Sequence, residues 1–104
     1  MNFEEPAVNQ YTIYSKSGCP NCIKAKTLLK ESNLIYNVIN CDEYLLECKT
    51  EFLAFIETMD KTNTDNNTKI TTFPIIFHDK QLVGGFKELQ NYVKKEELAF
   101  DSEF

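Results

Sequence analysis

The chain has 104 residues, enough for one domain that buries a hydrophobic core without obligatory disulfides or metal. Hydrophobic residues make up 42% of it and charged residues 26%, which is typical of a folded globular protein and too apolar for a disordered one. The net charge of −5 argues against general nucleic-acid binding, because that function needs a positive surface.

Targeting signals are not evident. No run approaches the roughly 20 apolar residues of a membrane span, and residues 1–10 do not follow the pattern of a signal peptide. We therefore expect a cytoplasmic protein, a monomer without a membrane partner. In the reducing cytosol, the four cysteines favour reactive, metal-bound or buried thiols over structural disulfides.

The first half of the chain predicts a strand, a helix and a second strand. Residues 1–10 have little pattern and are expected to be frayed, whereas the β-branched and aromatic residues 11–14 predict a strand. Pro20 suits the first position of a helix, and Cys22, Ala25 and Leu29 follow at helical spacing, so we predict a helix over residues 20–31. Residues 34–39 return to strand composition. A strand, a helix and a strand in succession form a βαβ unit, whose two strands are expected to be parallel.

The second half predicts a long helix, a hairpin and a last helix. Asp42 can cap a helix with one apolar stripe, formed by Leu45, Cys48, Phe52, Phe55, Ile56 and Met59. The polar segment 60–69 predicts an exposed loop. Residues 73–77 and 81–83 predict antiparallel strands around a turn at 78–80, and a helix is expected over 86–97 after Gly84-Gly85. Residues 101–104 are expected to fray.

The predicted order of elements is β-α-β-α-β-β-α. It indicates an α/β fold with a four-stranded mixed sheet, in which a parallel pair adjoins an antiparallel hairpin, flanked by three helices. We expect a single domain over residues 1–104 with its core at about 11–97.

Cys19 and Cys22 are separated by two residues, a spacing that zinc sites and redox sites share. A zinc site would need a second pair, but Cys41 and Cys48 are separated by six residues and Cys48 falls on the apolar face of the predicted helix. A structural disulfide closing so small a loop would remove little entropy from the unfolded chain. A redox pair accounts for more of the surrounding sequence.

Cys19 lies where the first strand gives way to a helix, so its sulfur should face the positive end of the helix dipole. That position, together with the ammonium of Lys16, is expected to lower the pKa of the Cys19 thiol below its ordinary value of about 8.5. Cys22 lies one turn further on and should point back toward Cys19. The pattern predicts a nucleophilic thiol and a resolving thiol.

Two further features admit more than one interpretation. Pro74 is either a simple proline at the start of a strand or a cis-proline. Gly84-Gly85 is either a tight turn or a place where the N–H groups at the start of the last helix approach a bound carboxylate.

With Cys-Pro-Asn-Cys after the first strand, Thr72-Phe73-Pro74 before the third and Gly84-Gly85 after the fourth, the sequence resembles a dithiol glutaredoxin of the thioredoxin-like superfamily. The likeness covers about residues 11–97. The family pattern is Cys-Pro-Tyr-Cys, then Thr-Val-Pro, then Gly-Gly and an Asp three residues beyond. Thioredoxins carry Trp-Cys-Gly-Pro-Cys instead, and this chain has no Trp.

The resemblance implies roles for individual residues. Cys19 would be the nucleophile and Cys22 the resolving thiol. Lys16 would meet the glycyl carboxylate of glutathione, the Phe73 backbone would pair with its cysteinyl part, and Pro74 would be a cis-proline facing the active site. The backbone N–H groups of the first turn of the last helix would hold the γ-glutamyl carboxylate. The implied glutathione-binding set is Lys16, Thr72, Phe73, Pro74, Gly85, Lys87 and Glu88.

The chain departs from the family pattern at four positions, three of them in this set. Asn21 replaces the usual Tyr, Phe73 is bulkier than Val, Lys87 replaces a Ser or Thr, and Glu88 stands where Asp is usual. The segment from residue 43 to 71 exceeds the usual length, and a basic contact from it could come from Lys69.

The resemblance implies a glutathione-dependent thiol–disulfide oxidoreductase that reduces protein disulfides and protein–glutathione mixed disulfides. No bound cofactor or metal is expected, and glutathione would be the reductant. Expected partners are glutathione and disulfide-containing or glutathionylated proteins, with ribonucleotide reductase as one candidate. The alternatives are an electron donor reduced by thioredoxin reductase, a carrier of metal or an iron–sulfur cluster, and a redox-silent interaction module. Cys41 and Cys48 are expected to have no role in turnover.

Overall fold

The computed structural model describes residues 3–59 and 73–101. In chain order, its elements are β1 (Tyr11–Ser15), α1 (Pro20–Glu31), β2 (Tyr36–Asn40), α2 (Asp42–Glu47), α3 (Lys49–Met59), β3 (Ile75–His78), β4 (Gln81–Gly84) and α4 (Phe86–Asp101). The strands form one sheet in the order β2-β1-β3-β4. β1 is parallel to β2, whereas the β1–β3 and β3–β4 pairs are antiparallel. The predicted mixed sheet is therefore confirmed.

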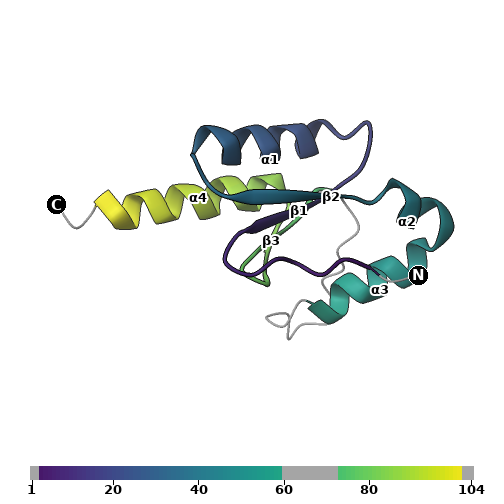
Figure 1. Cartoon of the computed structure of the whole chain (residues 1–104). Helices are drawn as coiled ribbons and strands as arrows, with labels where there is room; N and C mark the ends of the chain where they lie inside the picture. The colour runs from purple at the N-terminus through teal and green to yellow at the C-terminus, as the bar shows by residue number, and fades with distance from the viewer. Residues whose placement is uncertain (1–2, 60–72, 102–104) are drawn as a thin grey trace.

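Helices cover both faces of this sheet, α1 and α4 on one side and α3 on the other (Figure 1). Successive side chains of a strand point to opposite faces, so Ile13 packs under α1 and α4 while Tyr14 packs against α3. The first core consists of Tyr11, Ile13, Ala25, Leu29, Ile76, Leu89 and Val93. The second core consists of Tyr14, Ile39, Cys41, Phe52, Ile56, Ile75 and Phe77.

The single helix predicted after β2 is wrong, because the chain leaves helical geometry at Cys48 (φ −151°, ψ 51°) and forms α2 and α3. Residues 3–59 and 73–101 thus contain four helices around the sheet rather than the three expected. Asp42 is the first helical residue rather than the cap, a position that Cys41 occupies. The break has a packing reason: α3 buries Phe52 and Ile56, whereas α2 buries none of its residues, so only α3 must turn against the sheet.

The segment before β1 is packed rather than frayed. The ring of Phe3 lies against the rings of Tyr44, Phe52 and Phe55, at centroid distances of 4.9, 5.5 and 5.2 Å. The Tyr14 hydroxyl donates a hydrogen bond to the Glu4 carbonyl at 2.7 Å. A lone aromatic residue without periodic neighbours gives no pattern from which this docking could be predicted.

Other sequence predictions differ from the structure in extent only. The last helix continues to Asp101 instead of ending near residue 97. The loop predicted over residues 60–69, which includes Lys69, lies outside the described residues, and so does Thr72.

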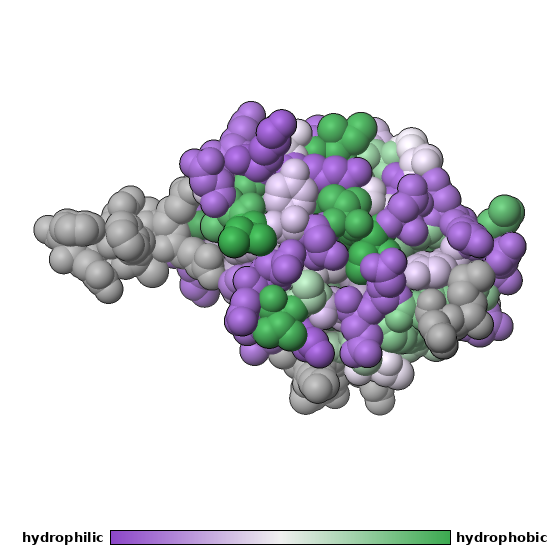
Figure 2. Space-filling model, viewed as in Figure 1, coloured by the Kyte–Doolittle hydropathy of each residue, from purple (hydrophilic) through white to green (hydrophobic). Residues whose placement is uncertain are grey.

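No helix in the described ranges is long and apolar enough to cross a membrane. Hydrophilic residues cover most of the face shown in Figure 2, with apolar ones in separate groups between them.

Candidate active site

The topology of the sheet gathers most of the predicted site residues at one end. β1 finishes at Ser15 and the chain then turns toward Cys19, while antiparallel β3 begins opposite Tyr14 with Ile75. One more step of the same register places Pro74 beside Ser15, and a further step places Phe73 beside Lys16. The contact agrees with this register, since the Lys16 ammonium lies 5.5 Å from the centroid of the Phe73 ring.

Cys19 occupies the cap position of α1. Its extended backbone (φ −111°, ψ 100°) precedes Pro20 at the first helical position, as predicted. Its sulfur accepts a hydrogen bond from the Cys22 N–H at 3.2 Å, so it lies against the N–H groups of the first helical turn. These groups and the positive end of the helix dipole favour a negative charge on this sulfur.

The structure joins Cys19 and Cys22 in a disulfide, with their Cα atoms 5.2 Å apart. Cys19 retains 7% of its surface exposed and Cys22 only 1%. Cys19 is thus the slightly more exposed of the two residues. The assignment of Cys19 as the nucleophile and Cys22 as the resolving thiol stays a prediction.

The turn that delivers Cys19 contains Gly18 in the left-handed region, with φ +71°. A side chain at this position would strain the backbone although space is open around it. The preceding residue, Ser17, donates hydrogen bonds to the Asp42 carboxylate from its backbone N–H, at 2.8 Å, and from its hydroxyl. Sequence reasoning missed Asp42 in this place, although the register of the parallel strands could have suggested it.

The Phe73–Pro74 peptide bond is cis, which confirms one of the two interpretations of Pro74. Pro74 is buried, and a Cβ added to Gly85 would lie 3.6 Å from the Pro74 carbonyl oxygen. The start of α4 therefore adjoins the cis-proline.

Glu88 closes the first turn of α4. Its carboxylate accepts a hydrogen bond from the Gly85 N–H at 2.8 Å, which is half of a capping box. Gly84 has φ +124°, and a Cβ there would come within 2.9 Å of the Glu88 side chain, so only glycine fits. The first intrahelical bond runs from the Leu89 N–H to the Gly85 carbonyl, and the geometry of helices leaves the preceding N–H groups of this turn available.

Six of the seven predicted glutathione-binding residues lie in the described ranges, and they form two neighbouring groups. Lys16, Phe73 and Pro74 lie together where β1 ends and β3 begins, whereas Gly85, Lys87 and Glu88 form the start of α4. Lys87 is exposed on the first turn. The seventh residue, Thr72, lies outside the described residues.

Cys41 lies apart from this chemistry, in the core beneath α3. Its thiol donates to the Ile39 carbonyl at 3.5 Å, and burial raises its pKa to about 12, so it stays neutral near pH 7. In residues 3–59 and 73–101, no three histidine, cysteine or acidic side chains are grouped so as to hold a metal ion.

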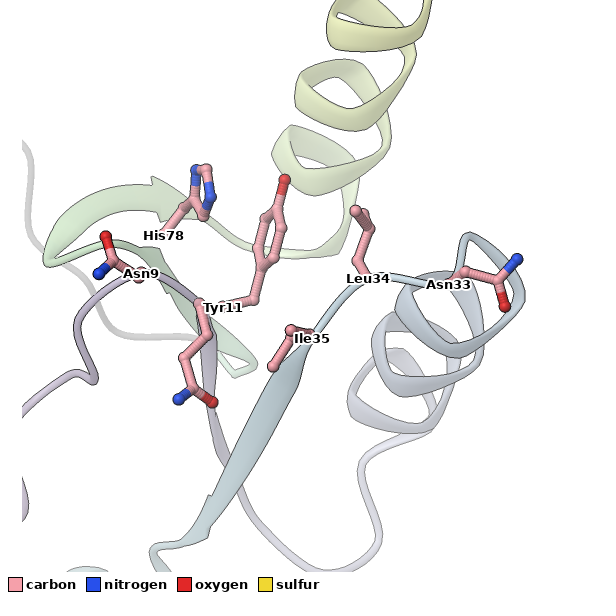
Figure 3. A pocket seen from close by; sticks show the side chains of 7 residues that line it. Asn9, Tyr11, Asn33, Leu34, Ile35 and His78 are labelled. Carbon is pink, nitrogen blue, oxygen red and sulfur yellow. The ribbon is translucent and has the colours of Figure 1, made fainter.

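A pocket of about 260 Å³ opens at the opposite end of the sheet, where β1 and β2 begin and β3 ends (Figure 3). Asn9, Tyr11 and His78 lie on one side of it, and Asn33, Leu34 and Ile35 on the other. The Tyr11 and His78 rings stack with their centroids 4.2 Å apart, and the His78 Nδ1 atom lies 2.7 Å from the Tyr92 hydroxyl. The pocket therefore lies away from the cysteine pair.

Comparison with known proteins supports the interpretation of the cysteine end. The family model described as Glutaredoxin matches residues 11–83. The chain is 39% identical over 79 residues to Glutaredoxin 1 of Rickettsia typhi, a match that covers 76% of this chain and 65% of that protein. It is 35% identical over 86 residues to Glutaredoxin 1 of Rickettsia prowazekii, covering 83% of this chain and 79% of the relative.

A solved structure has the same fold. The crystal structure of Glutaredoxin 1 from Francisella tularensis, complexed with cacodylate, superposes with a TM-score of 0.63 at 30% identity. The match covers 82% of this chain and 92% of that one. The fold, the Cys19–Cys22 pair and these relatives together establish that the chain belongs to the glutaredoxin family of thiol–disulfide oxidoreductases.

Proposed function

We propose that this protein is a glutathione-dependent oxidoreductase that reduces protein–glutathione mixed disulfides and protein disulfides. The observation that carries the proposal is the disulfide of Cys19 and Cys22 at the start of α1. The Lys16 ammonium, 5.5 Å from the ring of Phe73, and the cis bond between Phe73 and Pro74 support it. The positive charge of Lys16 supports the proposal that this residue binds the glycyl carboxylate of glutathione. The first turn of α4 supports binding of the γ-glutamyl carboxylate, because helix N-termini favour anions.

In the monothiol route, the Cys19 thiolate attacks the glutathione sulfur of a mixed disulfide. The protein sulfur leaves as a thiolate and takes up a proton, and glutathione is now joined to Cys19. A second glutathione thiolate attacks this glutathione sulfur and releases oxidised glutathione together with the Cys19 thiolate. A low pKa of Cys19 makes it a good leaving group in this last step.

In the dithiol route, Cys19 attacks a protein disulfide and forms a mixed disulfide with the substrate. Cys22 then attacks the Cys19 sulfur, which releases the substrate as a dithiol and leaves the Cys19–Cys22 disulfide seen in the structure. Two glutathione molecules return the pair to the dithiol form and leave as oxidised glutathione. The electrons for both routes come from glutathione, so the proposal needs no bound cofactor.

The test is the source of electrons. Insulin reduction by the purified protein is followed in two coupled assays, one with glutathione, glutathione reductase and NADPH, the other with thioredoxin reductase and NADPH. We expect turnover in the first assay. Turnover with thioredoxin reductase alone would reject glutathione dependence and favour a thioredoxin-reductase-linked donor, for instance one that serves ribonucleotide reductase.

A further inference from the structure

We propose that Asp42 is a positioning residue for the thiol exchange, because its carboxylate ties down the turn that carries Lys16 and Cys19 between β1 and α1. This inference rests on the proposed function, since it assigns Asp42 a part in the same reaction. Asp42 touches neither sulfur in the described contacts. It acts through Ser17.

The pairing of the parallel strands brings the two residues together. Ser15 is the register partner of Asn40, and the ladder continues one step beyond the strands, where the Cys41 N–H donates to the Ser15 carbonyl at 2.8 Å. Two residues past each strand, Ser17 and Asp42 therefore face one another. Their contact follows from the same register that forms the central pair of the sheet.

Both oxygens of the Asp42 carboxylate are used in this contact. The Ser17 backbone N–H donates to Oδ1 at 2.8 Å, and the Ser17 hydroxyl donates to Oδ2. The Asp42 backbone N–H in turn donates to the Asn40 side-chain oxygen at 2.8 Å, which fixes the start of α2. The hydrogen bonds from Ser17 hold the pKa of Asp42 below its usual value, so the carboxylate is charged near neutral pH.

The turn needs such an anchor because of its composition. Gly18 has φ +71°, and nothing lies within 4 Å of the place where its side chain would be. A glycine without packing neighbours restrains the backbone weakly. Before Gly18, the hydrogen bond from the Ser17 N–H to Asp42 holds the part of the turn that adjoins Lys16. After Gly18, Cys19 must stay aligned with α1, because its sulfur accepts a hydrogen bond from the Cys22 N–H. Displacements of about 1 Å near a reacting atom can slow a reaction by about 100-fold.

The charge and the hydrogen bonds of Asp42 have separable effects. Asp42→Asn removes the charge but keeps an amide oxygen that accepts from Ser17, whereas Asp42→Ala removes both. Ser17→Ala removes the hydroxyl bond and keeps the backbone bond. Glu43→Gln removes a charge from the same helical turn, and Glu43 is exposed, so it is the matched control for charge at the start of α2.

The experiment measures the rate at which iodoacetamide alkylates Cys19 as a function of pH, in a Cys22→Ser background and with the modified peptide identified by mass spectrometry. We expect Asp42→Ala to raise the apparent pKa of Cys19 by about one unit relative to Asp42→Asn, because a loosened turn lets the sulfur leave the helix start. With Cys22 intact, glutathione-linked turnover should fall about tenfold in Asp42→Ala and less than about threefold in Asp42→Asn. Ser17→Ala should lie between them, and Glu43→Gln should match the wild type.

Equal alkylation profiles for Asp42→Ala and Asp42→Asn would overturn the proposal, even if Asp42→Ala lowers the melting temperature, because a purely structural role predicts that result. The alkylation readout does not involve glutathione. If the wild-type protein shows no glutathione-linked turnover, the proposed function fails while the role of Asp42 is still decided by the pH profiles.

Discussion

The two ends of the sheet differ in the chemistry of their side chains. At the end where β1 finishes, a disulfide, the Lys16 ammonium and the Asp42 and Glu88 carboxylates lie around the loops. At the other end, amides line a pocket of about 260 Å³ whose aromatic rings, Tyr11 and His78, already stack on one another. This pocket lies at the end away from the cysteines.

The described pocket and the cysteine pair lie at opposite ends of the sheet, and the elements that meet there explain the difference. The loops at the reactive end join a strand to the start of α1 and to the start of α4, and helix starts supply N–H groups and positive potential. The end of α1 leads instead to the start of β2 beside the pocket, where carbonyl groups predominate. We therefore expect changes at the reactive end to alter turnover and changes at the pocket end to alter stability.

The largest effect is expected at the cysteines. Cys19→Ser should abolish turnover with both classes of substrate, because the nucleophile is lost. Cys22→Ser should retain reduction of protein–glutathione mixed disulfides and lose most reduction of insulin, since only the dithiol route needs the resolving thiol. Retained activity in Cys19→Ser would show that the chemistry resides elsewhere. The glutathione-coupled assay measures all of these activities.

A smaller effect on binding is expected at Lys16. Lys16→Gln should raise the KM for glutathione by about fivefold with little change in kcat, because an exposed ion pair contributes up to about 1 kcal/mol. Lys80→Gln is the matched control, since Lys80 is also exposed but lies in the turn at the pocket end. Equal KM values in the two variants would place the glycyl carboxylate away from Lys16.

At the pocket end, Tyr92→Phe should lower the free energy of unfolding without lowering the rate of turnover. The change removes the hydroxyl that lies 2.7 Å from the His78 Nδ1 atom, and a lost hydrogen bond typically costs about 0.5–1.5 kcal/mol. Urea unfolding measures the free energy of unfolding, and the coupled assay measures turnover. A several-fold drop in kcat would contradict the expectation that changes at the pocket end alter stability alone, and would mean that the two ends of the sheet are coupled.

A last effect concerns the pH dependence of stability. Burial raises the pKa of Cys41 from 9.0 to about 12, so the thiol favours the folded state fully below about pH 9, and this contribution is lost as pH rises toward 12. Burial also raises the pKa of Tyr14, and this main cause of the Tyr14 shift is common to the wild type and to Cys41→Ala, although the charge of an ionised Cys41 would raise it further in the wild type. Between pH 8 and about 10.5 the wild type should therefore lose roughly 2 kcal/mol more stability than Cys41→Ala. Parallel curves in urea unfolding would mean that the Cys41 thiol ionises in the folded protein.

The sequence predicted the sheet and the cysteine pair well because local patterns specify both. β-Branched and aromatic residues mark the strands, and Pro20 marks the start of α1 beside Cys19. The helix break at Cys48 was not predictable from the apolar stripe, since the break depends on how α3 meets the sheet.

Contacts between residues far apart in the sequence could not be predicted from it either. Phe3 joins the second core through residues more than 40 positions away, and Asp42 reaches Ser17 only because β1 and β2 pair in one register. The cis bond before Pro74 could be proposed only as one of two forms, because both suit a proline at the start of a strand.

The most direct test of the central claim is the pKa of the Cys19 thiol in the reduced protein, followed by the ultraviolet absorbance of the thiolate and assigned with a Cys19→Ser control. We predict a value clearly below about 8.5, because the sulfur accepts a hydrogen bond from the first turn of α1 and lies at the positive end of the helix dipole. A value at or above about 8.5 would contradict the claim that this end of the sheet activates Cys19.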